Sequence, residues 1–404
     1  MKKRITSIDG VRGIACFMVM FYHTNKNTIY NTSDLWTPST SDAHQTWLAF
    51  TNFFFGAHTG SQAVTIFLAI SGFVAAWGML GKANYNWVSY TIKRLGRLLL
   101  PCYAVLAILV ITGTATNAIW GVNLHDDWTR QGIFSGYYWG QLFGSFDFIF
   151  GTPTALYPPM WTIKWILYFS LMLPAVFVLM IKAEKFFSNN LIAVWAGSSL
   201  LSIIGFYCSD PQGDLNSLKF LPPFIIGVNL AMFYFKHPNT EDGRKNLKIK
   251  NNFILGAMLI AGLAIIKIPD YFFAFTGYTG QNYMGLWTVA SLPILYAILY
   301  FDPAIWFLST RPLQWLGKIS FSLFITHWAL VGNSNLEAIV ANASNPIMPF
   351  SPWLVMAVCI ALAWGFWKWA EMPLGRFANY LGQTSEKLVD NYFSQNKLAQ
   401  NKSE

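Results

Sequence analysis

Long apolar stretches separated by short polar segments run through most of the chain. A helix needs about 20 residues to cross a bilayer, and ten stretches reach or approach that length. They cover residues 9–24, 62–81, 97–116, 160–181, 190–208, 220–235, 253–268, 284–301, 319–335 and 353–370. This pattern predicts an all-α, polytopic integral membrane protein with about ten transmembrane helices.

The composition agrees with that fold class. Of the 404 residues, 54% are hydrophobic and only 11% are charged, whereas a soluble domain has about 25% charged residues. Such a chain is neither a soluble protein nor a disordered one, and it is not a nucleic-acid binder. The four cysteines lack a CxxC spacing and a histidine cluster, so we predict buried thiols and no metal site.

The basic residues predict the topology. With a cytoplasmic N-terminus, most of the 27 Lys and Arg residues fall in cytoplasmic segments, as the positive-inside rule requires. We therefore expect both termini in the cytoplasm. The first stretch is interrupted by Asp9 and Arg12 and is followed by no A-x-A cleavage site, which favours a retained helix over a signal peptide. We expect one transmembrane domain, residues 1–384, and a disordered cytoplasmic tail, residues 385–404.

Two segments predicted to be exterior loops, residues 25–60 and 117–158, are rich in Trp and Tyr. Such residues form aromatic belts at the membrane interface. They also stack on the apolar faces of sugars, so the loops fit a glycan-binding surface equally well.

Ionisable side chains inside the membrane are expensive and are candidates for function. The first stretch carries three of them: Asp9, Arg12 and His23. Asp9 and Arg12 are spaced i, i+3 and can neutralise each other. Arg12 and His23 are eleven residues apart, so they share a helix face at a separation of about 16 Å. Alternatively, Arg12 snorkels to the interface and His23 simply ends the helix.

A second group of candidates lies within and after the second stretch. Ser71 and Gly72 form a pair of small residues that is typical of close helix packing or of a local backbone opening. Lys93, Arg94 and Arg97 place three cations within five residues at the predicted cytoplasmic end. They suit either lipid phosphate or a phosphorylated cofactor.

Later stretches contain Trp161, Lys164 and His327. A lone Lys or His in a span is often a paired structural group, and these residues are therefore weaker candidates than those of the first stretch.

Taken together, five segments resemble the acyltransferase family 3 membrane proteins. They are Ile8-Asp9-Gly10-Val11-Arg12-Gly13 followed by His23, residues 67–73, Arg94-x-x-Arg97 followed by Pro101, residues 316–324 followed by His327, and Glu371-x-Pro373 followed by Arg376. The segments occur in the family's order and extend over residues 8–376. One position departs from the family pattern: Ile166 stands where members usually have a glutamate, which leaves the donor or the acceptor open.

The resemblance implies acyl transfer from a cytoplasmic acyl-CoA, most often acetyl-CoA, to a hydroxyl of a cell-envelope glycan. Lipopolysaccharide O-antigen and exopolysaccharide are examples of such acceptors. It also implies a bacterial inner membrane protein whose partners are a glycan and membrane lipid. Neither nucleic acid nor a metal is expected.

The same resemblance suggests roles for the candidates. His23 acts as general base, and Arg12, paired with Asp9, orients the donor or stabilises developing charge. Arg94, Arg97 and Lys93 hold the phosphates, and Ser71 and Gly72 lie beside the pantetheine arm. His327, Lys164 and Trp161 are assigned to the acceptor. A covalent acyl intermediate on His23 or Ser71 is an alternative. A transporter or flippase that uses the charges for a substrate path without acyl transfer is the rival function.

Overall fold

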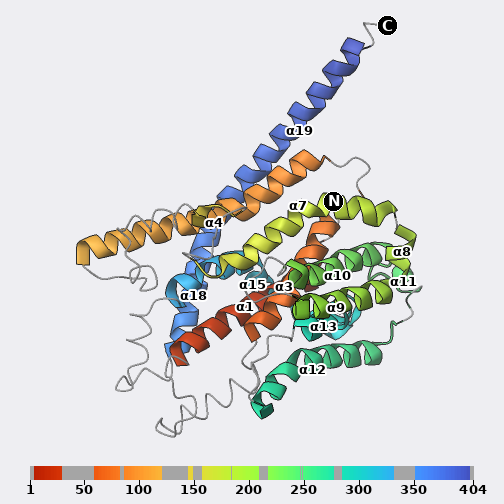
Figure 1. Ribbon diagram of the computed structural model, residues 1–404, viewed down its shortest axis with the longest axis horizontal. Helices are drawn as coiled ribbons and strands as arrows, with labels where there is room; N and C mark the ends of the chain where they lie inside the picture. The colour runs from red at the N-terminus through yellow and green to blue at the C-terminus, as the bar shows by residue number, and fades with distance from the viewer. Residues whose placement is uncertain are drawn as a thin grey trace.

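Helices account for all regular structure in the described part of the chain (Figure 1). The computed structural model describes residues 4–29, 59–81, 86–120, 144–148, 157–182, 184–208, 217–245, 247, 249–276, 284–331 and 351–400. The helices of the first half are α1 (Thr6–Ile29), α3 (Thr59–Met79), α4 (Trp87–Trp120), α7 (Met160–Lys182), α8 (Glu184–Asn189) and α9 (Leu191–Cys208). Those of the second half are α10 (Ser217–Lys236), α11 (Glu241–Lys245), α12 (Asn252–Thr276), α13 (Met284–Tyr300), α14 (Asp302–Leu308), α15 (Arg311–Thr326), α16 (Trp328–Val331), α18 (Ser351–Phe366), the π-helix η3 (Trp367–Glu371) and α19 (Met372–Gln400).

A helix lies at each of the ten predicted apolar stretches, so the all-α fold class is confirmed. The stretch 319–335 differs in detail, because α15 begins earlier and ends at Thr326. His327 forms a turn there, with its carbonyl accepting from the backbone N–H groups of Leu330 and Val331. The short helix α16 follows.

Five helices in the described residues are long and apolar enough to cross a membrane. A sixth is added if α13 and α14, which meet at a bend of 85°, form one broken span. Large apolar side chains on the outside, such as Ile192 at 69% exposed and Phe253 at 84%, are placed to face lipid. The protein is thus a membrane protein, while ten spans and cytoplasmic termini stay predictions.

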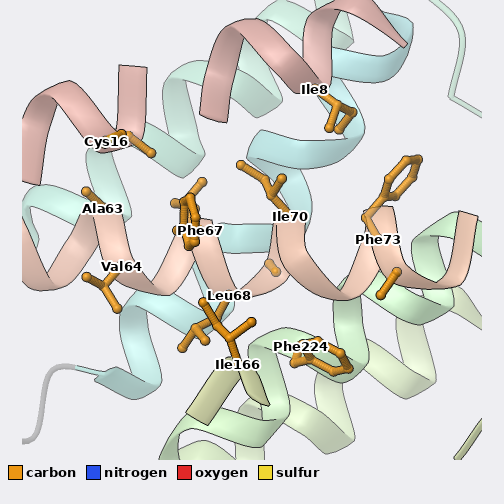
Figure 2. Packing of buried hydrophobic residues seen from close by; sticks show 14 of the residues in the cluster. Ile8, Cys16, Ala63, Val64, Phe67, Leu68, Ile70, Phe73, Ile166 and Phe224 are labelled. Atoms are coloured by element: carbon orange, nitrogen blue, oxygen red, sulfur yellow. The ribbon is translucent and has the colours of Figure 1, made fainter. Parts of the chain in front are cut away.

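Helix α3 forms the centre of the core. Most of its apolar residues are buried, including Leu68 and Ile70, which are at most 1% exposed. Figure 2 shows α3 with side chains from other helices packed beside it, among them Ile166 of α7 and Phe224 of α10. The helix is therefore a rigid support for the residues that it presents to its neighbours.

Helices α3 and α10 approach each other through glycines. A Cβ atom at Gly72 would lie 2.1 Å from the carbonyl oxygen of Phe224, and one at Gly227 would lie 1.8 Å from the carbonyl oxygen of Ala69. These distances are too short for any side chain. Small residues at such a contact are what allow membrane helices to pack closely.

Gly72→Ala should therefore destabilise the protein by about 1–3 kcal/mol, because the added methyl group forces two backbones apart. The matched control is Gly78→Ala on the same helix, where nothing lies within 4 Å of an added Cβ. The check is the thermal unfolding midpoint in detergent. Equal midpoints for the two variants would contradict the close packing of α3 on α10.

Helix α19 extends into residues 385–404, the segment predicted to form the cytoplasmic tail. The helix continues to Gln400 and projects beyond the other helices beside α4 (Figure 1). Glu386 bonds to Lys93 and Ser89 of α4, at 3.4 Å and 3.1 Å. The side chain of Lys93 lies directly over Gly382. These contacts hold a polar sequence in helical form that its composition alone does not favour.

Candidate active site

The first element of the site is the contact between α1 and α15. A Cβ atom at Gly13 would lie 2.7 Å from the backbone nitrogen of Gly317, and one at Gly317 would lie 2.3 Å from the carbonyl oxygen of Asp9. The two helices are thus close enough for the side chain of Arg12 to reach the backbone of α15.

Arg12 is fixed by three groups. Its Nη2 donates to the carbonyl oxygen of Gly317 at 2.7 Å, and its Nε donates to Oγ of Ser320 at 3.0 Å. The Oδ1 of Asp9 lies 3.3 Å from Nη2, and Asp9 also pairs with Arg4. The predicted Asp9–Arg12 pair is present, and the planar guanidinium is held in one orientation. Ser320 and Gly317 were not among the predicted site residues.

Arg12 lines a cavity of about 440 Å³ between α1, α3, α4, α7, α15 and the start of α19. Its charged lining residues are Arg12, Arg94, Arg97, Lys318, Arg376 and Glu371. Its apolar lining residues are Phe67, Ile70, Val74, Leu98, Ile166, Phe321 and Met372. Among the described residues, five cations therefore surround this cavity against one carboxylate. We call it the basic cavity.

Glu371 is that carboxylate. It ends the π-helix η3, and π-helical turns inside α-helices are frequent at functional sites. Its Oε2 accepts a hydrogen bond from Oγ of Ser322 at 2.5 Å. Glu371 and Arg376 were noted in the sequence only as parts of a closing motif. Neither was predicted as a site residue, and Lys318 was not either.

Arg94 is anchored on α7. Its Nε donates to Oγ of Ser170 at 3.1 Å, and that hydroxyl donates to the carbonyl oxygen of Ile166 at 2.6 Å. The side chain of Ile166 is 2% exposed and forms part of the cavity wall. Because Ile166 stands where the family usually has a glutamate, the cavity wall near Arg94 is apolar at this position.

A second cavity of about 350 Å³ adjoins the basic cavity, because Val74, Arg94 and Arg97 line both. Lys93 lines only this second one. The three predicted phosphate-binding cations are therefore brought together, but they are divided between two spaces.

The remaining candidates are placed differently. Ser71 lines the basic cavity. Gly72 lies instead at the contact with α10. Lys164 lies 5.7 Å from the ring centroid of Tyr168, and Trp161 packs against Phe220 at 5.1 Å. Neither Lys164 nor Trp161 belongs to the lining of the basic cavity.

At the other end of α1, His23 meets His327. The Nδ1 of His23 lies 2.9 Å from Nε2 of His327, and the two rings are parallel with centroids 5.2 Å apart. The ring of Trp328 stands edge-on to His23 at 4.9 Å. The residues are 304 positions apart in the sequence, and the structure joins them as one unit, the histidine pair.

The hydrogen bonds of the pair fix its tautomers. The Nδ1 of His327 lies 3.0 Å from the carbonyl oxygen of Leu323, which can only accept, so this nitrogen carries the proton. When His327 is neutral, its Nε2 is then an acceptor, and it must receive the proton of His23 Nδ1. The lone pair of His23 is consequently on its Nε2. A base whose tautomer is set by a second group is the usual arrangement for proton transfer.

The chain around His327 is firmly held. The backbone N–H of Ala329 donates to the hydroxyl of Tyr157 at 3.0 Å, and Sγ of Cys359 lies 3.7 Å from the carbonyl oxygen of His327. Both Tyr157 and Cys359 are buried. These contacts keep the imidazole of His327 in position.

The basic cavity and the histidine pair are separate regions, and helix α1 contributes a residue to each. Arg12 and His23 are about 16 Å apart along α1, from the helical rise. Phe324 lies between them: it stacks on the cavity residue Phe67 at 5.8 Å, and its ring centroid is 6.0 Å from that of His327. An elongated ligand is needed to reach from one region to the other.

Within the described ranges, no three His, Cys, Asp or Glu side chains gather closely enough to hold a metal ion. Most of the aromatic loops 25–60 and 117–158 lies outside the described residues. The proposed glycan-binding surface there stays a prediction.

Comparison with known proteins identifies the family to which this chain is similar. A family model described as an acyltransferase domain matches residues 5–369. A provisionally named O-acetyltransferase of Staphylococcus aureus strain COL is 25% identical over 346 residues, which are 81% of this chain and 50% of the relative. Similarly named proteins of strains MSSA476 and MRSA252 are 25% identical over 343 residues, with 80% and 50% coverage.

This chain spans about half the length of these relatives. No solved structure shows a significant match. The family match, in contrast, extends from before Asp9 to within two residues of Glu371 and so includes both the histidine pair and most of the basic cavity. The chain belongs to the acyltransferase 3 family of membrane proteins.

Proposed function

We propose that the protein transfers an acyl group, in the first place acetyl, from acyl-CoA to a hydroxyl of a cell-envelope glycan. The observation that carries this proposal is the pairing of two sites on one helix. Helix α1 presents Arg12 to a basic cavity at one end and His23 to a second imidazole at the other.

The basic cavity fits a phosphorylated donor. Gathering five cations within an apolar helical protein is costly unless an anion neutralises them. Guanidinium groups bind phosphate oxygens in bidentate fashion, which suits Arg94 and Arg97 to the phosphates of CoA. The apolar wall that includes Phe67 and Ile166 suits the less polar pantetheine arm. That arm is long and thin, and it would extend past Ser71 toward the histidine pair.

His23 is the general base in this scheme. Its Nε2 takes the proton of the acceptor hydroxyl while the hydroxyl oxygen attacks the thioester carbonyl carbon. The new C–O bond forms and the C–S bond breaks. The departing CoA thiolate then receives the proton from His23. His327 orients the imidazole and shares the positive charge that forms on it.

Arg12 serves the donor rather than the developing charge. About 16 Å of helix separates it from His23, so it is too far away to stabilise an oxyanion beside that residue. Its three fixed contacts instead hold a cation at the wall of the basic cavity.

The names of the relatives support acetyl as the transferred group. The distribution of Lys and Arg supports ten spans with both ends in the cytoplasm. A bacterial inner membrane location follows from the same scheme, because the donor is cytoplasmic and the acceptor is a glycan of the envelope.

The function can be tested by measuring ester-linked acetate, released by mild alkali, from the envelope glycan of cells with and without the gene. We expect the acetate to be lost with the gene and restored by the wild-type protein, but not by His23→Ala. Unchanged acetate together with altered export of a glycan or small molecule would favour a transporter or flippase.

Arg12→Lys is expected to weaken donor binding about tenfold, although the charge is kept, because an ammonium group cannot reproduce the fork-shaped contacts of the guanidinium. The check is the apparent KM for acetyl-CoA in membranes. Arg311→Lys, at the exposed start of α15 and in the lining of neither cavity, is the matched control and should change it little. An unchanged KM in Arg12→Lys would show that only the charge at this position matters.

A further inference from the structure

The second cavity has a composition of its own. It is lined by Val74, Ala75, Gly78, Asn86, Ser89, Tyr90, Lys93, Arg94, Arg97 and Glu386. Three cations, polar side chains and one aromatic ring therefore surround about 350 Å³. Such a lining suits a phosphorylated nucleoside better than the pantetheine arm, for which the apolar wall of the basic cavity is available.

Arg94 and Arg97 stand at the junction of the two cavities, since they line both. CoA carries a 5′-diphosphate and a 3′-monophosphate on one ribose, so its two phosphate groups are held a short, fixed distance apart. A diphosphate at the junction would put the 3′-phosphate on the side of Lys93.

Lys93 is held by a residue of α19. Its Nζ lies 3.4 Å from Oε2 of Glu386, and Ser89 donates to the same oxygen at 3.1 Å. The side chains of Lys93 and Glu386 are 32% and 45% exposed, so solvent screens the ion pair and it is easily exchanged for a stronger partner. A phosphate, with more charge and three acceptor oxygens, is such a partner.

From this geometry, and resting on the proposed function, we infer that the second cavity is the subsite for the 3′-phosphate of CoA. The Lys93–Glu386 pair is a latch that opens when this phosphate binds. Glu386 lies beyond the residues matched by the family model, which end at 369. Helix α19 therefore contributes a selectivity element of this chain to a cavity whose other described lining residues are Asn86 and residues of α3 and α4.

The test compares the binding of CoA and of 3′-dephospho-CoA to the full-length protein in detergent by isothermal titration. Wild type should bind CoA about tenfold more tightly, a preference that one charge-assisted phosphate contact can supply. In Lys93→Gln this ratio should fall close to one, with dephospho-CoA binding unchanged. Glu386→Gln should tighten CoA about threefold, because the competing carboxylate is removed.

Lys245→Gln is the matched control, since Lys245 forms an ion pair of 2.8 Å with Asp242 on α11 and lines neither cavity. Its ratio should equal that of wild type. All variants are compared only as monodisperse preparations.

The outcomes separate this inference from the proposed function. If wild type binds both ligands equally, or if Lys93→Gln keeps the wild-type preference, the subsite assignment is wrong. The proposal that CoA carries the donated acyl group is not affected by either result. If Glu386→Gln weakens CoA binding, the latch is wrong. If wild type binds neither ligand, the donor itself is wrong. Lys93-dependent binding of phosphatidylglycerol, and not of CoA, would assign the cavity to a lipid headgroup.

Discussion

Replacing His23 with alanine is expected to reduce acyl transfer by about 10²–10⁴-fold, the usual contribution of a positioned general base. The donor should still bind, because His23 lies about 16 Å from Arg12 along α1. The measurement is the initial rate of acetyl transfer in membranes at saturating acetyl-CoA, normalised to the amount of inserted protein.

Two further variants test whether the loss of rate is specific to the imidazole of His23. His327→Gln should lower the rate less than His23→Ala, since His327 acts through its 2.9 Å contact with His23. His237→Ala is the matched control, because that residue follows α10, its ring packs on Phe233 at 4.9 Å, and it lines neither cavity. A wild-type rate in His23→Ala would remove this residue from the mechanism.

The double variant Arg94→Ala and Arg97→Ala should weaken acetyl-CoA binding by about 100-fold or more, because two charge-assisted contacts to phosphate are lost. Both side chains line the two adjoining cavities, so the double variant removes two cations from each of them. The measurement is the dissociation constant of acetyl-CoA for the detergent-purified protein.

Arg311→Ala is the control for the general loss of a cation, since Arg311 is exposed at the start of α15 and lines neither cavity. It should bind acetyl-CoA like wild type. A normal dissociation constant in the double variant would show that the basic cavity is not the donor site.

The helices could be predicted from the sequence because each apolar stretch reaches or approaches the length that crossing a bilayer requires. The end of α15 could not, since the turn at His327 is accompanied by contacts with Tyr157 and Cys359 from other parts of the chain. The helical form of α19 beyond residue 385 depends likewise on its contact with α4, and its polar composition gave no sign of that partner.

The candidate site could also be predicted only in part, because contacts between distant segments cannot be seen in the sequence. The Asp9–Arg12 pair is local, so its i, i+3 spacing was enough. The contact between His23 and His327, the hydrogen bond from Arg12 to Ser320, and the inclusion of Lys318 all join segments about 300 residues apart. Helical periodicity orders side chains on one helix and carries no information about which helices become neighbours.

Acyl transfer itself can be measured with purified protein in liposomes, ¹⁴C-acetyl-CoA and an envelope glycan fraction. We expect label in the glycan that mild alkali releases. This label should be lost in His23→Ala, which still binds acetyl-CoA, and in the Arg94 and Arg97 double variant, whose binding of acetyl-CoA is weakened. Labelling that is equal in all three proteins, or absent from wild type although acetyl-CoA binds, would contradict the proposed function.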